Sequence, residues 1–417
     1  MMLKAAKIKG FKVLMGVLTF VAIFGFQAFS NTEHGAEAHA EAAEHTEKEV
    51  FKPGDMILDH IKDSYGWHIA DIGGHPISIP LPVILITKDN GLVVFSSSAF
   101  NHGHSAYTLG ETANFKGLAF RRDNQGYDSL DVSLTSHFVL KDGHVVSFRS
   151  PEAGFDYTNI HNLNEGITRE ASVMDFFNGK NGSFIDISIT KNVFSLLLAV
   201  GLLLFVFLSI AKAYTNTRGK APKGLQSFME PLILFIRDEV AKPSIGHGYE
   251  KFLPYLLTVF FFIWINNMMG LIPVFPFGAN VTGNIAVTLV LAIFTFVLTH
   301  INAKKTYWKH IFLPDVPGWL LPLMIPIEIF GTLIKPVVLT LRLFANITAG
   351  HIIVLAFFSL IFIFGAMAPV AGFGVSIVSV AFTIFMNFME LLVAFLQAYV
   401  FTLLSAIYIG MAVEEHH

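Results

Sequence analysis

The sequence predicts a mainly α-helical, polytopic membrane protein that is preceded by a small exported, mainly β domain. Hydrophobic residues make up 53% of the 417 residues and charged residues only 14%, which is unlike an ordinary soluble protein. After Asp186, long apolar runs alternate with short loops that carry Lys or Arg, and this pattern is typical of membrane-crossing helices. Before Asp186, short alternating runs separated by turn residues indicate β hairpins.

The composition also excludes several functions. The chain has no cysteine, so it can form neither disulfides nor thiolate metal sites. Its formal net charge of −3 provides no overall basic field for nucleic acid. We therefore predict no nucleic-acid binding, and no motif indicates a cofactor or a metal centre.

Residues 1–30 have the pattern of a secretory signal peptide, with lysines, an apolar run from Val13 to Ala28 and then small residues. An uncleaved anchor is the alternative for this apolar run. Residues 31–50 consist largely of Ala, Glu and His, which predicts a disordered acidic tail. The histidines of this tail match no metal-ligand spacing, and we assign them no ligand role.

Residues 51–182 predict the exported domain through two hairpin signals. Val83–Thr87 is joined to Leu92–Phe95 through Asn90-Gly91, and a second reversal is expected at Asp142-Gly143, after the alternating Leu130, Val132 and Leu134. The scattered histidines of this region have no metal-ligand interval. Its sequence indicates no function.

Residues 183–417 predict the membrane domain, with about five crossings that include a long tilted helical hairpin. A helix needs about 20 residues to cross the hydrocarbon of a bilayer. The runs near or above that length are Val193–Ala211, Phe252–Ile272, Ile285–Ile301, Val337–Phe364 and Val375–Met411. Leu225–Val240 is amphipathic, so we expect it to lie along the membrane interface.

The loops predict the orientation of these crossings. Basic residues follow the first and third runs, namely Lys212, Arg218, Lys220, Lys223, Lys304, Lys305 and Lys309. The loops Pro273–Val281 and Gly365–Gly374 have no Lys or Arg and are therefore expected outside the cytoplasm. The N-terminal domain is expected on that same outer side.

Arg342 is the strongest candidate for a functional residue. An ionisable group in a spanning helix costs about 2.5–3.5 kcal/mol on insertion scales. The segment Pro336–His351 around Arg342 contains no Asp or Glu. Its counter-charge must therefore come from another helix or from another chain.

Arg342 shares one predicted helical face with four other polar residues. They are Glu328, Thr332, Lys335 and Asn346. Glu328 and Lys335 lie toward the inner end of this stripe, where a structural ion pair or a snorkelling lysine explains them as well as a transport role does.

A second polar group is predicted from His351 and the last apolar run. His351 lies nine residues beyond Arg342, about 13 Å along the helix axis and nearly on the opposite side. The last run carries a polar stripe made of Thr383, Asn387, Glu390 and Gln397. Glu390 is either a neutral acid in a helix–helix hydrogen bond or, with His351, part of a proton relay; we favour the relay because of the cost of burying both groups.

Several motifs closely resemble the signature of the a subunits of F-type (rotary) ATP synthases. The matching segments are Lys335–Asn346, Ala349-Gly350, Leu396–Phe401, Asn266–Pro273 and Tyr408–Ala412. The resemblance covers residues 186–417, and the exported domain lies outside the common pattern of the family.

The resemblance implies a bacterial inner-membrane stator subunit that is not an enzyme by itself. It implies two aqueous half-channels for protons, with Arg342 facing the carboxylates of a ring of c subunits. It also implies that Asn346 and Gln397 lie near the arginine and Glu328 near the inner half-channel. The implied partners are the c-subunit ring, b-type peripheral stalk subunits, the remainder of the ATP synthase and the lipid membrane.

The sequence departs from many bacterial members of that family at one pair of positions. Those members have an acid where this chain has His351 and a histidine where it has Glu390, so the pair is exchanged here, as in mitochondrial-type members. A transporter or channel that acts alone is the main alternative, although the chain shows no paired repeats. An intramembrane hydrolase is a weaker one, because the known catalytic motifs are missing. The choice between proton and sodium is open.

Overall fold

A computed structural model describes residues 53–54, 57, 61–72, 75–88, 91–103, 137–141, 144–149, 167–179, 183–216, 221–272, 274–314 and 316–414. The signal segment and the acidic tail expected at residues 1–50 lie outside these ranges. The chain divides into two compact units, of which one comprises Lys62–Phe194 and the other contains Ser195–His417. Each unit is described by itself.

The first unit consists mainly of short antiparallel strands. The strands are β1 Gly66–Ile72, β2 His75–Pro80, β3 Pro82–Thr87, β4 Gly91–Ser96, β5 His137–Lys141, β6 His144–Arg149, β7 Ile167–Glu170 and β8 Phe184–Asp186. They form three sheets with the orders β1-β2, β4-β3-β8 and β5-β6-β7. A 3₁₀ helix η1 (Ser97–Gly103) follows β4, and a short helix α3 (Val173–Phe177) precedes β8.

Both predicted hairpins are confirmed. Strands β3 and β4 pair with Val83 opposite Phe95, and Gly91 has the positive φ of 70° that the reversal requires. Strands β5 and β6 pair across residues 142–143. The hairpin β1–β2 was not predicted, although Gly73-Gly74 between its strands is a turn signal. The predicted alternation at residues 130–134 lies outside the described residues.

The core of this unit follows from the two-residue period of its strands. Val83 and Leu85 of β3 are fully buried, whereas Leu92 and Val94 of the edge strand β4 are exposed. Phe138 of β5 packs edge to face on Phe184 of β8, with ring centroids 5.5 Å apart. This contact joins two of the three sheets into one apolar cluster.

The same unit holds the first turn of helix α4 (Lys191–Asn216). The Asp63 carboxylate accepts hydrogen bonds from the Asn192 amide at 2.9 Å, the Thr190 hydroxyl at 2.7 Å and the Ser64 amide at 3.0 Å. The amide of Lys191 donates to the Ser64 carbonyl. Asp63 therefore satisfies donors that a helix start leaves unpaired, from a position 129 residues away in the chain.

Burial raises the pKa of the Asp63 carboxyl in spite of these donors. A carboxyl with a pKa above its unfolded value disfavours folding while it is ionised. That cost disappears as the pH falls from the folded-state pKa to below the unfolded-state pKa. The hydrogen bonds of Asp63, rather than its negative charge, therefore stabilise the start of α4.

The second unit is helical. After α4 it contains α5 Leu225–Phe235, a π-helix η4 Ile236–Ala241, α6 Lys242–Ile245, η5 Tyr249–Lys251, α7 Leu253–Gly270, α8 Ile285–Ile301, α9 Lys305–Phe312, α10 Leu321–Met367 and α11 Pro369–Val413. Among the described residues, four helices (α4, α7, α10 and α11) are long and apolar enough to cross a membrane. Helices α8 and α9 are bent by 105° relative to each other, and they provide a fifth span if the pair is taken as one broken span. This confirms the predicted helical membrane fold.

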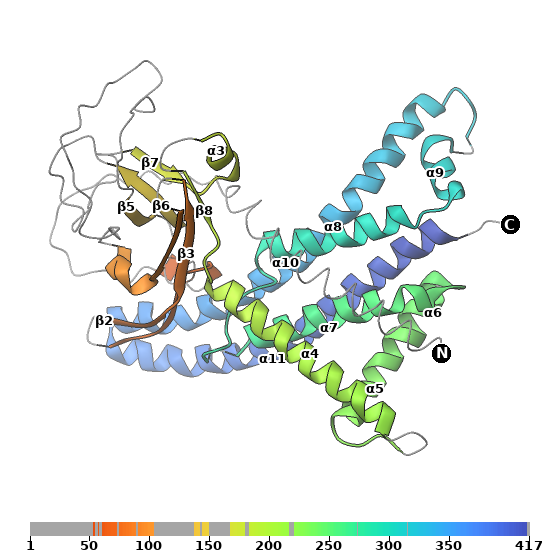
Figure 1. The fold of residues 1–417 in the computed structure, drawn as a ribbon. Coiled ribbons are helices and arrows are strands. Elements are labelled where there is room, and N and C mark those ends of the chain that lie inside the picture. Colours follow the sequence, from red (N-terminus) through yellow and green to blue (C-terminus); the bar gives the residue numbers. More distant parts are fainter. Residues whose placement is uncertain are drawn as a thin grey trace. The chain divides into compact units, whose positions relative to one another are not determined.

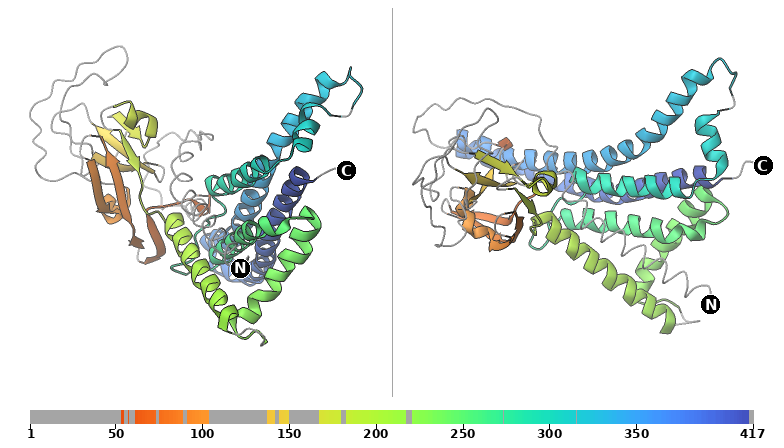
Figure 2. Two further views of the ribbon diagram at one scale, coloured as in Figure 1. Left: turned by 45° about the vertical axis from the view of Figure 1, so that its right-hand side comes forward. Right: turned by 45° about the horizontal axis from the view of Figure 1, so that its top comes forward.

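Helices α10 and α11 form a long antiparallel hairpin; they lie side by side near the turn and diverge toward the start of α10 (Figures 1 and 2). At 1.5 Å per residue the 47 residues of α10 span about 70 Å, more than twice the hydrocarbon thickness of about 30 Å. A hairpin of this length must be strongly tilted to remain in a bilayer, as the sequence predicts.

The predicted limits of this hairpin were wrong. Helix α10 begins sixteen residues before Val337, and the expected loop Gly365–Gly374 is helical except for Ala368. The predicted run began directly after Pro336, but Pro326 and Pro336 are both accommodated inside α10. Glycines make the tight turn possible, because a Cβ on Gly372 would lie 2.7 Å from the Cα of Gly365.

We predict that Asp63→Ala loosens the start of α4, whereas Asp63→Asn does not. Alanine leaves the Asn192 amide and the Thr190 hydroxyl without their acceptor, and loss of a helix cap costs about 1–2 kcal/mol. Asparagine keeps an acceptor oxygen and removes the buried charge. Amide hydrogen exchange of the purified full-length chain should be about tenfold faster at residue 192 in the alanine variant. Equal protection in the two variants would contradict the role of the Asp63 hydrogen bonds.

Candidate functional site

The structure brings His351 of α10 and Glu390 of α11 together. The His351 Nδ1 lies 3.3 Å from the Glu390 Oε1. Glu390 is only 5% exposed, and His351 is half-buried. The two residues that sequence analysis paired therefore lie in one place.

A glycine makes this approach possible. Gly350 precedes His351 on α10, and a Cβ at this position would lie 3.0 Å from the Glu390 Oε1 and 3.2 Å from its Cδ. Any other residue at position 350 would therefore press on the carboxyl group. The close contact of α10 and α11 at this level depends on the missing side chain.

Helix α7 and the segment after it close the other side of the pair. A Cβ on Gly270 would lie 3.8 Å from the His351 Nε2. The Asn267 side chain donates to the Ala394 carbonyl of α11 at 3.1 Å and accepts from the Thr282 hydroxyl at 2.5 Å. These bonds hold α7 and residue 282 against α11, one turn beyond Glu390.

Sequence reasoning did not assign Asn267 and Thr282 to the site. Asn267 was noted only within the matching segment Asn266–Pro273. Two adjacent asparagines in an apolar run were the available signal, because a buried amide needs partners. Thr282 offered no comparable signal, since a lone threonine in a loop is ordinary.

Several buried polar atoms of this region have no hydrogen-bond partner within the described part of the chain. They are the Glu390 Oε1, the Asn266 Oδ1, the Asn280 Nδ2, the Thr348 Oγ1 and the Thr383 Oγ1. The Glu390 oxygen is close to His351 but is not aligned for a hydrogen bond with it. Unpaired polar atoms are costly in an apolar interior.

Arg342 and Asn346 occupy the exposed side of α10 instead. Their exposed neighbours on that side, Val338 and Leu341, are apolar. Of the described residues, none forms an ion pair with Arg342. The counter-charge that sequence analysis sought is therefore not supplied by the described helices, and the exposed side is open to another chain.

The remaining predicted residues divide between buried and exposed positions. Gln397 is buried on α11 with Glu390, whereas Thr383 is half-buried and Asn387 is exposed. The predicted stripe is thus split, because Asn387 is rotated by about 60° from Glu390 around a helix with 3.6 residues per turn.

The inner group of the α10 stripe forms its own set of contacts. Glu328 and Lys335 interact electrostatically, and the hydroxyl of Thr332 donates to the Glu328 carbonyl at 2.9 Å. The Lys335 Nζ lies 5.4 Å from the ring centroid of Tyr408 on α11. Tyr408 in turn is within electrostatic range of Arg342.

No group of three or more His, Asp or Glu side chains in the described ranges could hold a metal ion. His351 and Glu390 can take up and release protons, whereas the guanidinium of Arg342 keeps its charge.

Comparison with known proteins identifies two regions of the chain. A family model described as ATP synthase A chain matches residues 193–410. A second model, described as a domain of unknown function (DUF8433), matches residues 56–175.

Relatives of known name match the helical part. An ATP synthase subunit a of Chloroherpeton thalassium is 48% identical over 240 residues, which are 55% of this chain and 69% of that protein. ATP synthase subunit a 2 of Chlorobaculum tepidum is 52% identical over 235 residues, 54% of this chain and 64% of that protein. An ATP synthase subunit a of Myxococcus xanthus is 42% identical over 242 residues, 56% of this chain and 75% of that protein.

We predict that Gly350→Ala separates His351 from Glu390. The new methyl group would lie 3.0 Å from the Glu390 Oε1, and the flexible carboxyl end must move away from it. Gly331→Ala is the matched control, because Gly331 lies on the same helix and a Cβ there meets nothing within 4 Å. Cryo-electron microscopy of both variants should show a separation clearly longer than 3.3 Å only for the position 350 variant. An unchanged separation would contradict the packing argument.

Proposed function

This chain belongs to the ATP synthase A chain family, and from that premise we propose that it provides two aqueous half-channels for protons beside a rotating ring of c subunits. The exposed, unpaired Arg342 carries the proposal. A guanidinium on an apolar helix face is costly unless a partner meets it, and a ring of membrane-embedded carboxylates is a partner of the required charge.

Arginine suits this position better than any other cation. Its guanidinium stays charged where a desolvated lysine amine can lose its proton. A fixed positive charge favours the ionised form of a passing carboxylate, which then gives up its proton. Because arginine cannot itself release a proton, it also blocks a direct route past the ring. Proton flow is then possible only with rotation.

The outer half-channel is proposed to pass His351 and Glu390. Their 3.3 Å contact and the Glu390 Oε1, which has no hydrogen-bond partner within the described part of the chain, support a hydrated route, because water can satisfy such an atom. Asn346 lies between His351 and Arg342 on α10, and the buried Gln397 follows Glu390 on the antiparallel helix α11. Both residues would continue this route toward Arg342. Glu328, Lys335 and Thr332 would belong to the inner half-channel, with Thr383 and Asn387 as supporting polar positions of α11.

We propose the remaining partners and the orientation on the same premise. The chain would work in a bacterial inner membrane, with the ring of c subunits, b-type peripheral stalk subunits and the other ATP synthase subunits. Lys304 and Lys305 mark the cytoplasmic side, and the N-terminal domain lies outside. ATP chemistry would occur on other subunits.

We predict that Arg342→Lys abolishes ATP-driven proton pumping, even where the complex assembles. Lysine keeps the charge number but loses the fixed protonation and the forked geometry. The measurement is acidification of inside-out membrane vesicles, with the amount of assembled complex determined in parallel. Arg237→Lys is the control, because Arg237 pairs with Asp238 outside the spans and lysine can replace it there. Pumping by Arg342→Lys at the wild-type rate would refute the proposed role.

A second prediction concerns the exchanged pair. His351→Glu combined with Glu390→His should recover more proton-driven ATP synthesis than either single substitution. Each group stabilises the charged form of the other, and a single change leaves one ionisable group buried without its partner. The interaction is measured as the departure from additivity in a double-mutant cycle. Purely additive losses would mean that Glu390 is a packing acid rather than a relay member.

A further inference from the structure

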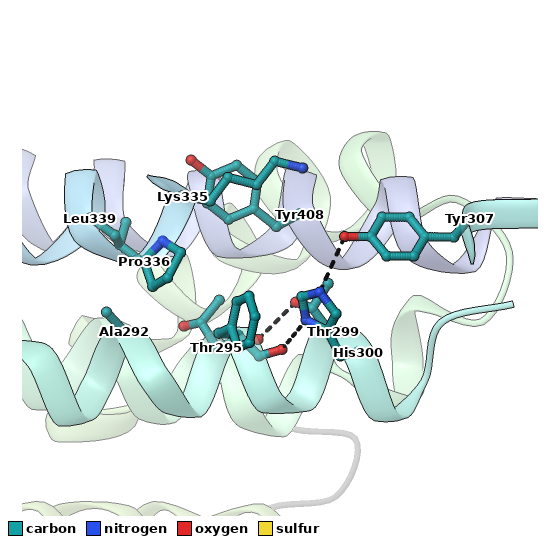
Figure 3. Close-up of a pocket in the computed structure, with 10 residues that line it drawn as sticks. Ala292, Thr295, Thr299, His300, Tyr307, Lys335, Pro336, Leu339 and Tyr408 are labelled. Atoms are coloured by element: carbon teal, nitrogen blue, oxygen red, sulfur yellow. Dashed lines mark hydrogen bonds between the residues drawn. The ribbon is translucent and has the colours of Figure 1, made fainter. Parts of the chain in front are cut away.

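A pocket outside the His351 and Glu390 pair lies among helices α8, α9, α10 and α11 (Figure 3). Its polar lining residues are Thr295, Thr299, His300, Tyr307, Lys335 and Tyr408. Lys335 and Tyr408 form one wall, and the residues of α8 lie opposite them (Figure 3). The proposed function uses Lys335 but leaves the histidine of this pocket unexplained.

The imidazole of His300 is held in one orientation. Its Nδ1 lies 2.7 Å from the Phe296 carbonyl oxygen, and because a carbonyl only accepts, Nδ1 carries the hydrogen. The ring also packs on Phe296, with ring centroids 3.9 Å apart. The second nitrogen, Nε2, is left to gain and lose a proton, and it lies 3.5 Å from the hydroxyl of Tyr307 (Figure 3).

Several charged or titratable side chains lie around the pocket of His300. The ammonium of Lys335 lines the same pocket and opposes a second positive charge there. Glu328 partly offsets this effect, because it interacts with both Lys335 and Tyr307. The other titratable group that faces the pocket is the phenol of Tyr408.

The position of His300 suits exchange with the inner aqueous phase. It is the second-last residue of α8, and Lys304 and Lys305 follow directly. On the other side of the pocket, Tyr408 is within electrostatic range of Arg342. Lys335 lies seven residues before Arg342, about 10 Å along α10. The lining residues of the pocket therefore lie between the lysine-bearing end of α8 and the part of α10 that precedes Arg342.

We propose that His300 is a proton carrier of the inner half-channel. In the pumping direction, Nε2 takes a proton from water at the inner surface and passes it to water in the pocket, which returns the imidazole to its neutral form. The hydrogen bond from Nδ1 to Phe296 is kept throughout. This inference rests on the proposed function, since it assigns a residue to one of the two half-channels.

The competing explanation is that His300 only fastens α8 to α9 through Tyr307. A structural role of that kind predicts a loss of assembled complex but no change in the pH profile of transport. A proton carrier predicts a change of the profile itself, because histidine changes its charge between about pH 5 and pH 8.

The test uses inside-out membrane vesicles that contain the complete ATP synthase, with the inner face outward. The initial rate of ATP-driven acidification is measured against external pH and divided by the ATP hydrolysis rate of the same complex after detergent uncoupling. For the wild type we expect this ratio to fall with one step between about pH 5 and pH 8. His300→Gln should lose the step and lower the ratio about tenfold at the acidic end. This is less than the roughly 10²-fold of a directly reacting group, since water remains as a carrier.

His310→Gln is the matched control, because His310 is an exposed histidine of α9 near the same surface and should leave the step unchanged. The inference is overturned if the pH profile of His300→Gln coincides with that of the wild type. It is also overturned if His300→Gln and His310→Gln lose the step equally. If His300→Gln does not assemble, Tyr307→Phe replaces it, and an unchanged midpoint of the step then overturns the inference. If this test fails while Arg342→Lys is still inactive, only the role of His300 as a proton carrier is refuted. If Arg342→Lys pumps protons, the proposed function itself is refuted.

Discussion

The cost of holding an ionisable group inside hydrocarbon organises the helical unit. Glu390 is buried, and the imidazole of His351 is the group that can offset this cost, with the His351 Nδ1 3.3 Å from the Glu390 Oε1. Arg342 meets it differently, because it lies on the exposed side of α10 and has no ion-pair partner among the described residues. Helix α10 thus carries His351, which faces an acid of the same chain, and nine residues earlier Arg342, which faces none among the described residues.

Close backbone contacts set the positions of these groups. Gly350 lets Glu390 approach α10, and Gly365 and Gly372 let the hairpin turn within one residue. Near the other end of α11, a Cβ on Gly410 would lie 1.9 Å from the Ser244 carbonyl oxygen, so α11 also packs directly on α6. Small residues are expected at such interfaces, because lipid provides no hydrophobic force between helices. The glycines therefore determine which polar side chains of α10 and α11 can meet.

Sequence analysis could predict the features that depend on local residue pattern and on the free-energy cost of placing a charge in the membrane. Arg342 was identified because no acid in its segment neutralises it, and β3 and β4 because alternation and Asn90-Gly91 are local signals. The ends of α10 were missed because prolines and an uncharged stretch are ambiguous inside a membrane, where neighbouring helices accommodate proline. The contact of Thr282 with Asn267 and the pocket of His300 depend on the register of separate helices, for which no local signal exists. The pairing of His351 with Glu390 could be proposed only because both residues are costly to bury.

The two polar regions differ in a way that fits a two-sided path. Around Glu390, carboxyl, amide and hydroxyl atoms are buried without partners, whereas the pocket of His300 carries a lysine, a histidine and two tyrosines near the lysine-bearing end of α8. Arg342 lies between the two regions along α10, because Lys335 precedes it and His351 follows it. A proton that travels through both regions has to pass this fixed charge, and the described helices offer no carboxylate beside it. Under the proposed function, the proton leaves this chain at that point, crosses on a carboxylate of the ring and returns on the other side.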